Sequence, residues 1–299
     1  MVKYERREDE RMISINNLTT VIEGKKILNN INLKWSSNQK VGIIGLNGAG
    51  KTSIFKSILQ LGFFQNNSIS YPANLNIKDD IGYLSENRGL FTKETVAKNL
   101  SYFALLNLLD APTAAKSIKF WLSFFKINEL SDKKIFELSK GNQQKVQFIA
   151  SIIGLPKYMI LDEPFSGIDP LNADLFIQAI NYLFENNTTV MYSSHQMNYV
   201  EEIADMIYVI KDGQIVESGT LNDIKNRYRT ISVMNSKELE TLKNKLAKSS
   251  LQFFADNNSF TVPNSHKLIS DFKDYKISQP SLEQIFKLIN GEANIEKTI

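Results

Sequence analysis

The chain contains no cysteine, and this absence excludes disulfide bridges and cysteine-ligated metal centres. A chain without thiols also fits a reducing cytoplasm. Long apolar runs are lacking too: the best two, residues 102–109 and 148–155, are far shorter than the roughly 20 apolar residues that a membrane-spanning helix needs. Residues 1–11 are nearly all charged with no apolar stretch behind them, so no signal peptide is predicted. We therefore expect a soluble protein that reaches a membrane only through a partner.

An excess of one charge is also missing. The 35 basic and 32 acidic residues leave a net charge of +3, too small for a global field that would attract nucleic acid. A content of 42% hydrophobic and 22% charged residues is that of an ordinary globular protein. The length of 299 residues allows one large domain, or one large and one small domain. Residues 3–11 mix both signs and are expected to form a solvated tail.

Apolar patterning predicts the elements of the first two thirds of the chain. Strands are expected over residues 12–18 and 27–35 (joined by a turn at 23–25), 41–44, 158–161 and 189–192. Helical spacing predicts a helix over residues 51–61 that ends at Gly62. A helix before each of the last two strands gives the β-α-β alternation of a parallel sheet, so the fold class is α/β.

The middle of the chain, between residues 92 and 140, carries helical periods and many aromatic residues. These aromatics are expected to be core and inter-helix packing rather than a cofactor site: Tyr102, Phe103, Phe120, Trp121, Phe124 and Phe125.

The sequence pattern changes near residue 230, where a small α+β appendage is predicted. We call residues 230–299 the C-terminal appendage. Its expected elements are a strand over residues 231–234, a lysine-rich helix over 236–249, a hairpin of 252–254 with 260–262 about residues 256–258, and a helix over 281–289.

A glycine-rich loop between a predicted strand and a predicted helix matches G-x-x-x-x-G-K-[ST]. It consists of Gly45, Leu46, Asn47, Gly48, Ala49, Gly50, Lys51 and Thr52, and Ser53 follows. Glycines let the backbone N–H groups turn toward phosphate oxygens, and the helix adds its positive N-terminal end. Lys51 supplies a point charge for the β- and γ-phosphates, and the Thr52 hydroxyl suits Mg²⁺. The alternative is a glycine-rich turn that matches by chance; the flanking strand and helix favour a P-loop, a class that includes kinases, GTPases and motors.

Two further strand ends carry residues suited to phosphate chemistry. Asp162 can hold Mg²⁺ through water, and Glu163 beside it can polarise an attacking water. The alternative is a solvated strand terminus. His195 follows the last strand, at the edge where open α/β sheets bind ligands, which favours contact with the γ-phosphate over a structural role. His266 has no such context and is expected on the surface.

Four further motifs occur once each and in a fixed order. They are Leu-Ser-Lys-Gly-Asn-Gln-Gln-Lys at 138–145, Met-Ile-Leu-Asp-Glu-Pro at 159–164, Ser-Gly-Ile-Asp at 166–169 and Ser-Ser-His at 193–195. Together with the loop they resemble the nucleotide-binding domain of ATP-binding cassette (ABC) proteins over residues 12–227. The resemblance implies a P-loop NTPase with a RecA-like core, an antiparallel β subdomain and a helical subdomain at about 92–145. The ATPase domain would be residues 12–229, followed by the appendage.

The resemblance also implies how the site works. In this family two cassettes face each other head to tail, and the signature of one, here Ser139 and Gly141, closes over ATP held by the other. Asp169 belongs to the D-loop of that interface, and Mg²⁺ would be held at Thr52, Glu86 and Asp162. ATP would join a homodimer or a pair of related cassettes, and hydrolysis would part them.

Three positions depart from the family pattern. Glu86 stands where glutamine is usual, and a carboxylate can still bind Mg²⁺ or its water. Lys140 and Asn142 replace Gly and Gln in the signature. Ile22 falls where an aromatic side chain normally stacks on adenine, so GTP is expected to compete comparatively well with ATP.

The end of the chain narrows the resemblance further. Gln-Pro-Ser-Leu-Glu-Gln-Ile-Phe at 279–286 resembles the closing helix of exporter ATPases of the sodium, drug or antimicrobial-peptide efflux type. This implies an ATPase coupled to a separate membrane permease at the cytoplasmic face of the cell membrane, near residues 86–91, with no nucleic acid partner. The alternative is a soluble ABC protein acting on ribosomes or DNA, which would normally carry two cassettes or a long coiled-coil insertion. A non-hydrolysing module would lack Glu163.

Overall fold

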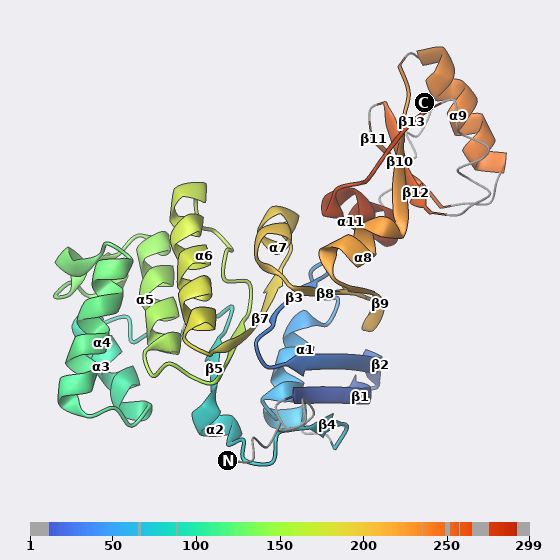
Figure 1. Ribbon diagram of the computed structural model, residues 1–299. Coiled ribbons are helices and arrows are strands. Elements are labelled where there is room, and N and C mark those ends of the chain that lie inside the picture. The colour runs from blue at the N-terminus through green and yellow to red at the C-terminus, as the bar shows by residue number, and fades with distance from the viewer. Residues whose placement is uncertain are drawn as a thin grey trace, which may run out of the picture.

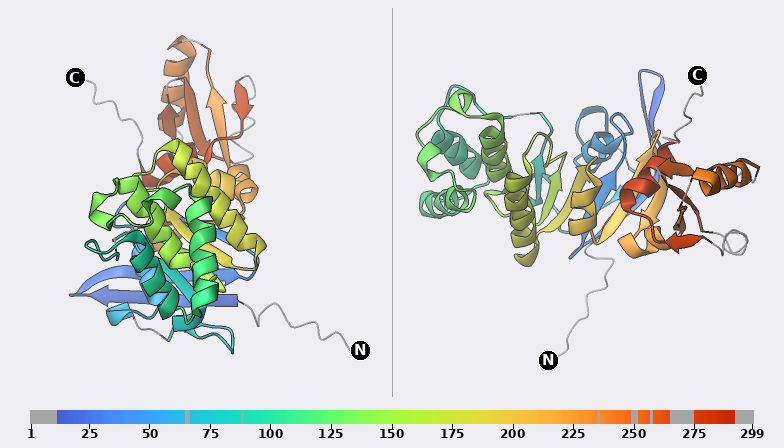
Figure 2. Two further views of the ribbon diagram at one scale, coloured as in Figure 1. Left: turned by 90° about the vertical axis from the view of Figure 1, so that its left-hand side faces the viewer. Right: turned by 90° about the horizontal axis from the view of Figure 1, so that it is seen from above.

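A computed structural model describes residues 12–64, 67–87, 89–234, 236–248, 252–256, 258–264 and 275–291. The predicted tail at 1–11 and His266 lie outside these residues. Three parts lie in a row: a group of helices at one end, the sheets in the middle and the appendage at the other end (Figure 1). The right-hand view in Figure 2 shows the same order from above. No helix within the described ranges is both long and apolar enough to cross a membrane.

The central sheet has six strands in the order β5-β6-β7-β3-β8-β9. All neighbours are parallel except β8 and β9. The bounds are β3 Lys40–Ile44, β5 Ile81–Leu84, β6 Tyr158–Leu161, β7 Thr189–Ser194, β8 Met206–Lys211 and β9 Gln214–Gly219. Side chains alternate between two cores, as Met159 and Leu161 face the helices while Tyr158 and Ile160 face the opposite layer. The predicted parallel α/β arrangement is confirmed.

The opposite layer is an antiparallel sheet of order β2-β1-β4. Its strands are β1 Met12–Ile22, β2 Lys25–Ser36 and β4 Ile69–Ser70, so both predicted strands are longer than expected. Glu23 and Gly24 form the turn with positive φ. Trp35 packs edge-on against Tyr158, with ring centroids 5.1 Å apart, and so joins this layer to the central sheet.

Helix α1 (Lys51–Ile58) ends earlier than the predicted Gly62. Gln60 takes the left-handed conformation with φ 51°. The amides of Leu61 and Gln60 donate to the carbonyls of Lys56 and Ser57, which is the Schellman pattern that usually has glycine at this position. The expected end was wrong because Gln60, not Gly62, supplies the terminating conformation.

The helical end of the molecule is built from helices with side-chain N-caps. Thr95, Asp110, Ser139 and Asp169 cap α3 (Val96–Leu106), α4 (Ala111–Phe124), α5 (Lys140–Ile152) and α6 (Pro170–Glu185). The 3₁₀ turns Asn128–Leu130 and Ile135–Glu137 also belong to this end. Helices α2 (Ile77–Asp80) and α7 (Met197–Ile203) lie beside the central sheet instead, and the 3₁₀ turn Gly62–Phe64 follows α1.

The expectation that the aromatics of this region are core holds only in part. Trp121 and Phe125 are buried, whereas Tyr102 and Phe120 are 44% and 41% exposed. Because Tyr102 and Phe120 lie on helix faces that no described element covers completely, periodicity alone could not place them.

The C-terminal appendage has its own antiparallel sheet of order β11-β12-β10-β13 and its own small core about Phe260 and Leu242. Helix α8 (Leu221–Asn226) precedes the appendage. The appendage elements are β10 Tyr228–Ser232, which begins two residues before the predicted boundary, α9 Ser236–Lys248, β11 Phe254–Asp256, β12 Ser259–Pro263, β13 Lys276–Ser278 and α11 Leu282–Asn290. The strand expected over 231–234 was displaced, because β10 pairs with β12 from Tyr228 to Ser232. The expected 252–254 strand likewise lies at β11, and β13 was not predicted. Asn257, in the predicted turn, lies outside the described residues.

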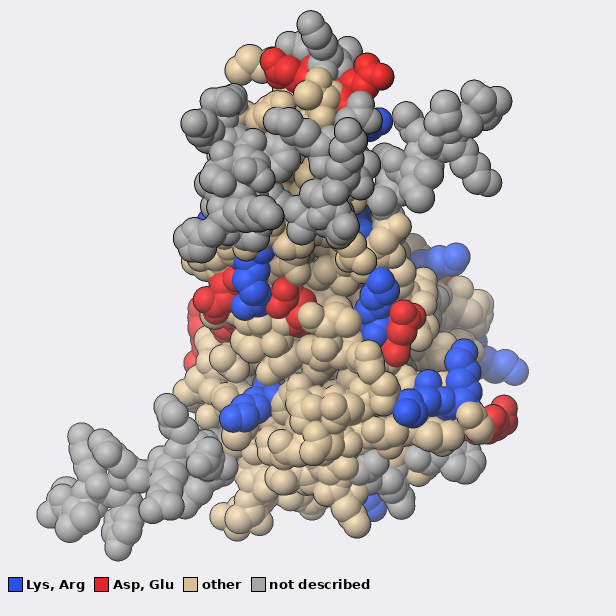
Figure 3. All heavy atoms as spheres, turned by 90° about the vertical axis from the view of Figure 1, so that its right-hand side faces the viewer, with Lys and Arg blue, Asp and Glu red and all other residues tan. Residues whose placement is uncertain are grey.

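On the face that includes the appendage, acidic and basic side chains are interspersed over a mainly uncharged surface (Figure 3).

Helix α11 differs from the rest of the appendage, since Leu282, Ile285 and Phe286 belong to the main core under the central sheet.

Candidate active site

The glycine-rich loop connects β3 to α1 at the carboxyl edge of the central sheet. Two of its glycines are required by contacts within this chain. A Cβ at Gly45 would lie 2.6 Å from the Ile210 carbonyl oxygen, and one at Gly50 would lie 2.9 Å from Leu28 while φ there is 113°. Gly48 also has positive φ, 80°. The loop therefore lies so close to β8 and β2 that only glycine fits at positions 45 and 50, and it leads directly into α1.

Lys51 is buried at the start of α1 and points back over the loop. Its Nζ donates to the carbonyl oxygens of Gly45 and Leu46, at 2.8 and 3.4 Å. The same Nζ lies 3.1 Å from Oε1 of Glu163, an ion pair whose side chains are 7% and 9% exposed. A buried cation in this position offers a charge to any anion that enters the loop.

Asp162 and Glu163 leave the end of β6 in different directions. The Thr52 hydroxyl donates to Oδ2 of Asp162 at 2.7 Å. Oε2 of Glu163 instead lies 2.8 Å from Nδ1 of His195. Glu163 has φ 51°, an uncommon conformation for a non-glycine residue, and this turns the two neighbouring carboxylates apart.

Ser193 ties the two carboxylate residues together, and we assigned it no role from the sequence. Its hydroxyl is fully buried, donates to Oδ1 of Asp162 at 2.7 Å and accepts from the backbone amide of Glu163 at 2.8 Å. Its place in the motif beside His195 was the only signal in the sequence.

Two more residues support the site without having been predicted. Gln147, buried in α5, donates to the carbonyls of Ser85 and Asn87 at 2.9 and 3.1 Å and so holds the segment that carries Glu86. Burial, followed by the negative charge of Asp162, raises the pKa of Tyr83 well above its usual value, so this phenol stays neutral beside the carboxylate.

A cleft of about 460 Å³ brings most of these groups together. Its lining residues are Ile27, Asn47, Gly48, Gly50, Lys51, Thr52, Ser53, Glu86, Asp162 and Glu163. Leu46 and Asn47 also line a neighbouring cleft with His195. We call the loop with Asp162, Glu163 and His195 the phosphate half of the site.

The donor atoms of this half suit Mg²⁺ bound together with a nucleotide. Among the residues that the structure describes, no three His, Asp or Glu side chains group into a metal site of their own. The Thr52 hydroxyl and the Asp162 carboxylate lie side by side, and Glu86 lines the same cleft. Mg²⁺ typically binds one or two such protein oxygens when phosphates and water complete its coordination shell.

Ser139, Gly141 and Asp169 lie apart from this cleft, and we call them the closing half. Ser139 caps α5, which begins at Lys140, and accepts from the Asn142 amide at 3.3 Å. Asp169 caps α6, and hydrogen bonds from Asn172 hold the pKa of this exposed carboxyl below its usual value. A Cβ at Gly141 would meet nothing within 4 Å, so no contact within the chain requires glycine there.

Ile22 is half-buried at the end of β1, where it pairs with Lys25. It does not line the phosphate cleft, whereas Ile27 of β2 does. Ile22, the side chain predicted to lie against the base, is thus outside this cleft.

Comparisons with known proteins bear on the family and the fold. A family model described as ABC transporter matches residues 28–166. YhaQ of Bacillus subtilis (strain 168), an uncharacterized ABC transporter ATP-binding protein, is 34% identical over 289 residues, which cover 92% of this chain and 97% of that protein. The bacitracin transport ATP-binding protein BcrA of Enterococcus faecalis is 28% identical over 88% of this chain and 85% of its own length.

Solved structures show the same fold. An ATP binding subunit of an ABC transporter superposes with a TM-score of 0.67 at 24% identity, covering 72% of this chain and 92% of that one. An ATP-binding cassette in a dimeric post-hydrolysis state bound to ADP and Pi gives 0.63 at 20% identity, covering 70% and 98%. The family suggested by the motifs is confirmed by the family model and by YhaQ, which matches nearly end to end. This chain belongs to the ABC transporter ATP-binding proteins.

Proposed function

We propose that the chain hydrolyses Mg·ATP as one cassette of a dimer, and that this drives an exporter through a separate membrane subunit. The ATPase unit would be residues 12–229, with the appendage following it. The observation that carries the proposal is the position of Glu163, a buried carboxylate held between Lys51 and His195 beside the phosphate loop. A module that only binds nucleotide has no use for a carboxylate held at this point.

The geometry suggests how Glu163 becomes available as a base. Its Oε1 faces Lys51, and its Oε2 faces His195. When Lys51 exchanges this contact for the γ-phosphate, Oε1 is left free to accept a proton from water, while His195 still fixes Oε2. The water oxygen attacks the γ-phosphorus, the bond to the β-phosphate oxygen breaks, and ADP leaves with that electron pair. Thr52 and Asp162 would hold Mg²⁺, which neutralises phosphate charge as it develops.

A second cassette would supply the closing half. Ser139 and the positive N-terminal end of α5 are exposed and lie outside the phosphate cleft of their own chain. A hydroxyl, a backbone N–H and a helix N-terminus are together suited to a phosphate brought by another molecule. This supports a homodimer, or a pair with a related cassette, that closes on ATP.

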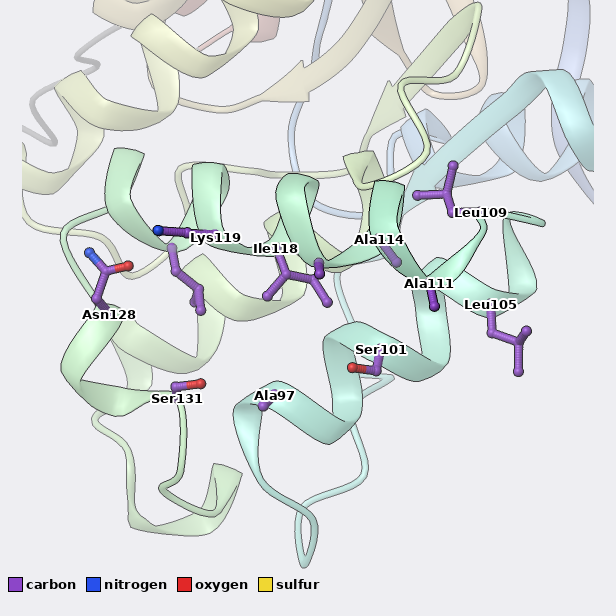
Figure 4. Close-up of a pocket in the computed structure, with 12 residues that line it drawn as sticks. Ala97, Ser101, Leu105, Leu109, Ala111, Ala114, Ile118, Lys119, Asn128 and Ser131 are labelled. Carbon is purple, nitrogen blue, oxygen red and sulfur yellow. The ribbon is translucent and has the colours of Figure 1, made fainter.

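The membrane subunit would dock on an exposed apolar patch formed by Phe91, Tyr102, Leu105, Leu106 and Leu108. Leu105 also borders a groove of about 570 Å³ between α3 and α4, lined mainly by small and aliphatic side chains (Figure 4). Asn99 of α3 bonds both the amide and the carbonyl of Phe91, so movement of the segment after Glu86 would reach this patch. Changing Leu105 and Leu106 to Glu should release the chain from membranes of its native cells without lowering ATP hydrolysis by the purified chain; retention on the membranes would refute this location.

The direction of transport is supported by likeness alone. BcrA, named for bacitracin transport, aligns over 88% of this chain and therefore includes much of the appendage. With the closing-helix motif, this favours export from the cytoplasmic face of the cell membrane.

The direct test is Glu163→Gln. It keeps the shape of the side chain but removes the base, so hydrolysis should fall by about 10²–10⁴-fold. ATP binding should persist, and ATP should trap a dimer that size-exclusion chromatography with light scattering can detect. Unchanged hydrolysis, measured as phosphate release, would show that the base is misassigned. Glu202→Gln, an exposed glutamate on α7, is the matched control.

A further inference from the structure

Helix α11 belongs to the appendage by sequence but is anchored in the ATPase core at both ends. At its start, the Leu282 amide donates to Oε1 of Glu201 on α7 at 2.6 Å. At its end, Lys211 of β8 donates to the Ile289 carbonyl at 2.7 Å. Between them Ile285 and Phe286 are buried in the main core. The helix therefore cannot shift without disturbing α7 or β8.

Glu201 is the point where three helices meet. Besides the Leu282 amide, its Oε1 lies 3.2 Å from Nζ of Lys225 on α8, and the two side chains are only 29% and 17% exposed. A carboxylate is also favoured beside the positive N-terminal end of α11. These contacts fix the far end of α7 on the appendage side.

The start of α7 lies next to His195 in the sequence. Only Gln196 separates His195 from Met197, the first residue of α7, which is buried. On its inner side α7 is held by Tyr199 against Phe165, with ring centroids 4.5 Å apart. The His195 side chain itself is 48% exposed. A cleft of about 810 Å³ lies between His195 and Phe286 of α11, so that side of the ring is not packed. The direction in which His195 reaches Glu163 thus depends on α7.

We propose that Glu201 is a positioning residue for ATP hydrolysis. By holding the start of α11 it fixes α7, and α7 fixes the backbone from which His195 contacts Glu163. Toward the appendage, Nζ of Lys287 on α11 lies 5.6 Å from the ring centroid of Phe254 in the appendage sheet. The appendage would therefore set the activity of the cassette through α11. This inference rests on the proposed hydrolytic role of Glu163 and His195.

The kinetic test is Glu201→Ala in the full chain. We expect kcat to fall roughly 3- to 30-fold, which lies within the coupling that contacting residues show. KM for ATP should stay unchanged, because Lys51 and Thr52 are not affected. Glu201→Gln keeps an oxygen acceptor for the Leu282 amide and should restore most of the rate. Glu202→Ala, the exposed neighbour on the same helix, should behave as wild type.

A readout that does not depend on turnover separates positioning from general destabilisation. The chain has two histidines, so the spectrum of a His266→Gln background contains one imidazole signal, that of His195. In this background Glu201→Ala should shift the NMR signal of the His195 ring, and Glu202→Ala should not. An unshifted signal, or a kcat equal to wild type, would overturn the proposal. If Glu163→Gln still hydrolyses ATP while the ring signal responds to Glu201→Ala, the hydrolytic assignment fails and the positional link stands.

Discussion

The phosphate half and the closing half of the site differ in what holds them. In the phosphate half, hydrogen bonds and an ion pair link Lys51, Asp162, Glu163, Ser193 and His195. Neighbouring atoms of the same chain also leave room only for glycine at two loop positions, Gly45 and Gly50. In the closing half, Ser139 and Asp169 bond only the first turns of their own helices, and the site of a Cβ at Gly141 is open. The residues of the phosphate half are thus held by one another. The residues of the closing half, in the described structure, do not contact the phosphate half of their own chain.

The largest test of this difference is Gly141→Asp. Because nothing crowds Gly141 and a carboxylate suits the first turn of a helix, the thermal midpoint should not fall. Hydrolysis should nevertheless be lost, because the new charge would face the phosphate held by the other cassette. A Lys51→Ala chain should be inactive for the opposite reason, loss of the cation in its own loop.

Mixing these two inactive chains provides the control. A mixed dimer contains one intact site, formed by the loop of the Gly141→Asp chain and the signature of the Lys51→Ala chain. Phosphate release by the mixture should rise well above that of either parent. No recovery would mean that the two halves do not meet between chains. Gly89→Asp, another glycine with open space, should keep its activity alone.

A smaller effect should appear within the phosphate half. Ser193→Ala removes one hydroxyl and leaves the buried amide of Glu163 and Oδ1 of Asp162 without it. Unsatisfied buried groups cost about 1–3 kcal/mol. For a domain of this size that corresponds to roughly 2–10 °C in the thermal midpoint, measured by calorimetry. Ser151→Ala, whose hydroxyl bonds a carbonyl of its own helix, should change little; equal losses would argue against a special role for Ser193.

The two halves also differed in how far the sequence could predict them. Lys51, Thr52, Asp162, Glu163 and His195 lie at strand ends or a helix start, and the edge of a parallel sheet brings such positions together. That geometry follows from pattern alone.

Ser193 and Gln147 were missed because their roles depend on side-chain directions across elements far apart in the chain. The same holds for α11, whose motif was visible at 279–286 but whose burial against α7 was not. The displaced start of β10 had a similar long-range origin, since pairing with β12 sets it. The end of α1 was missed for a local reason, because Gln60 adopts the left-handed conformation that glycine usually takes.

The smallest predicted effect is on the preference for one nucleotide base over another. Ile22 and Ile27 are aliphatic, so we expect a base bound near them to be packed but not stacked. We expect the Kd values for ATP and GTP to lie within about tenfold, or 1.4 kcal/mol, in competition binding. Ile22→Tyr should tighten ATP by roughly 1 kcal/mol through stacking, whereas Ile22→Leu should not. A strong preference of the wild-type chain for ATP would mean that residues other than Ile22 recognise the base. The isoleucine at position 22 would then have no effect on nucleotide selectivity.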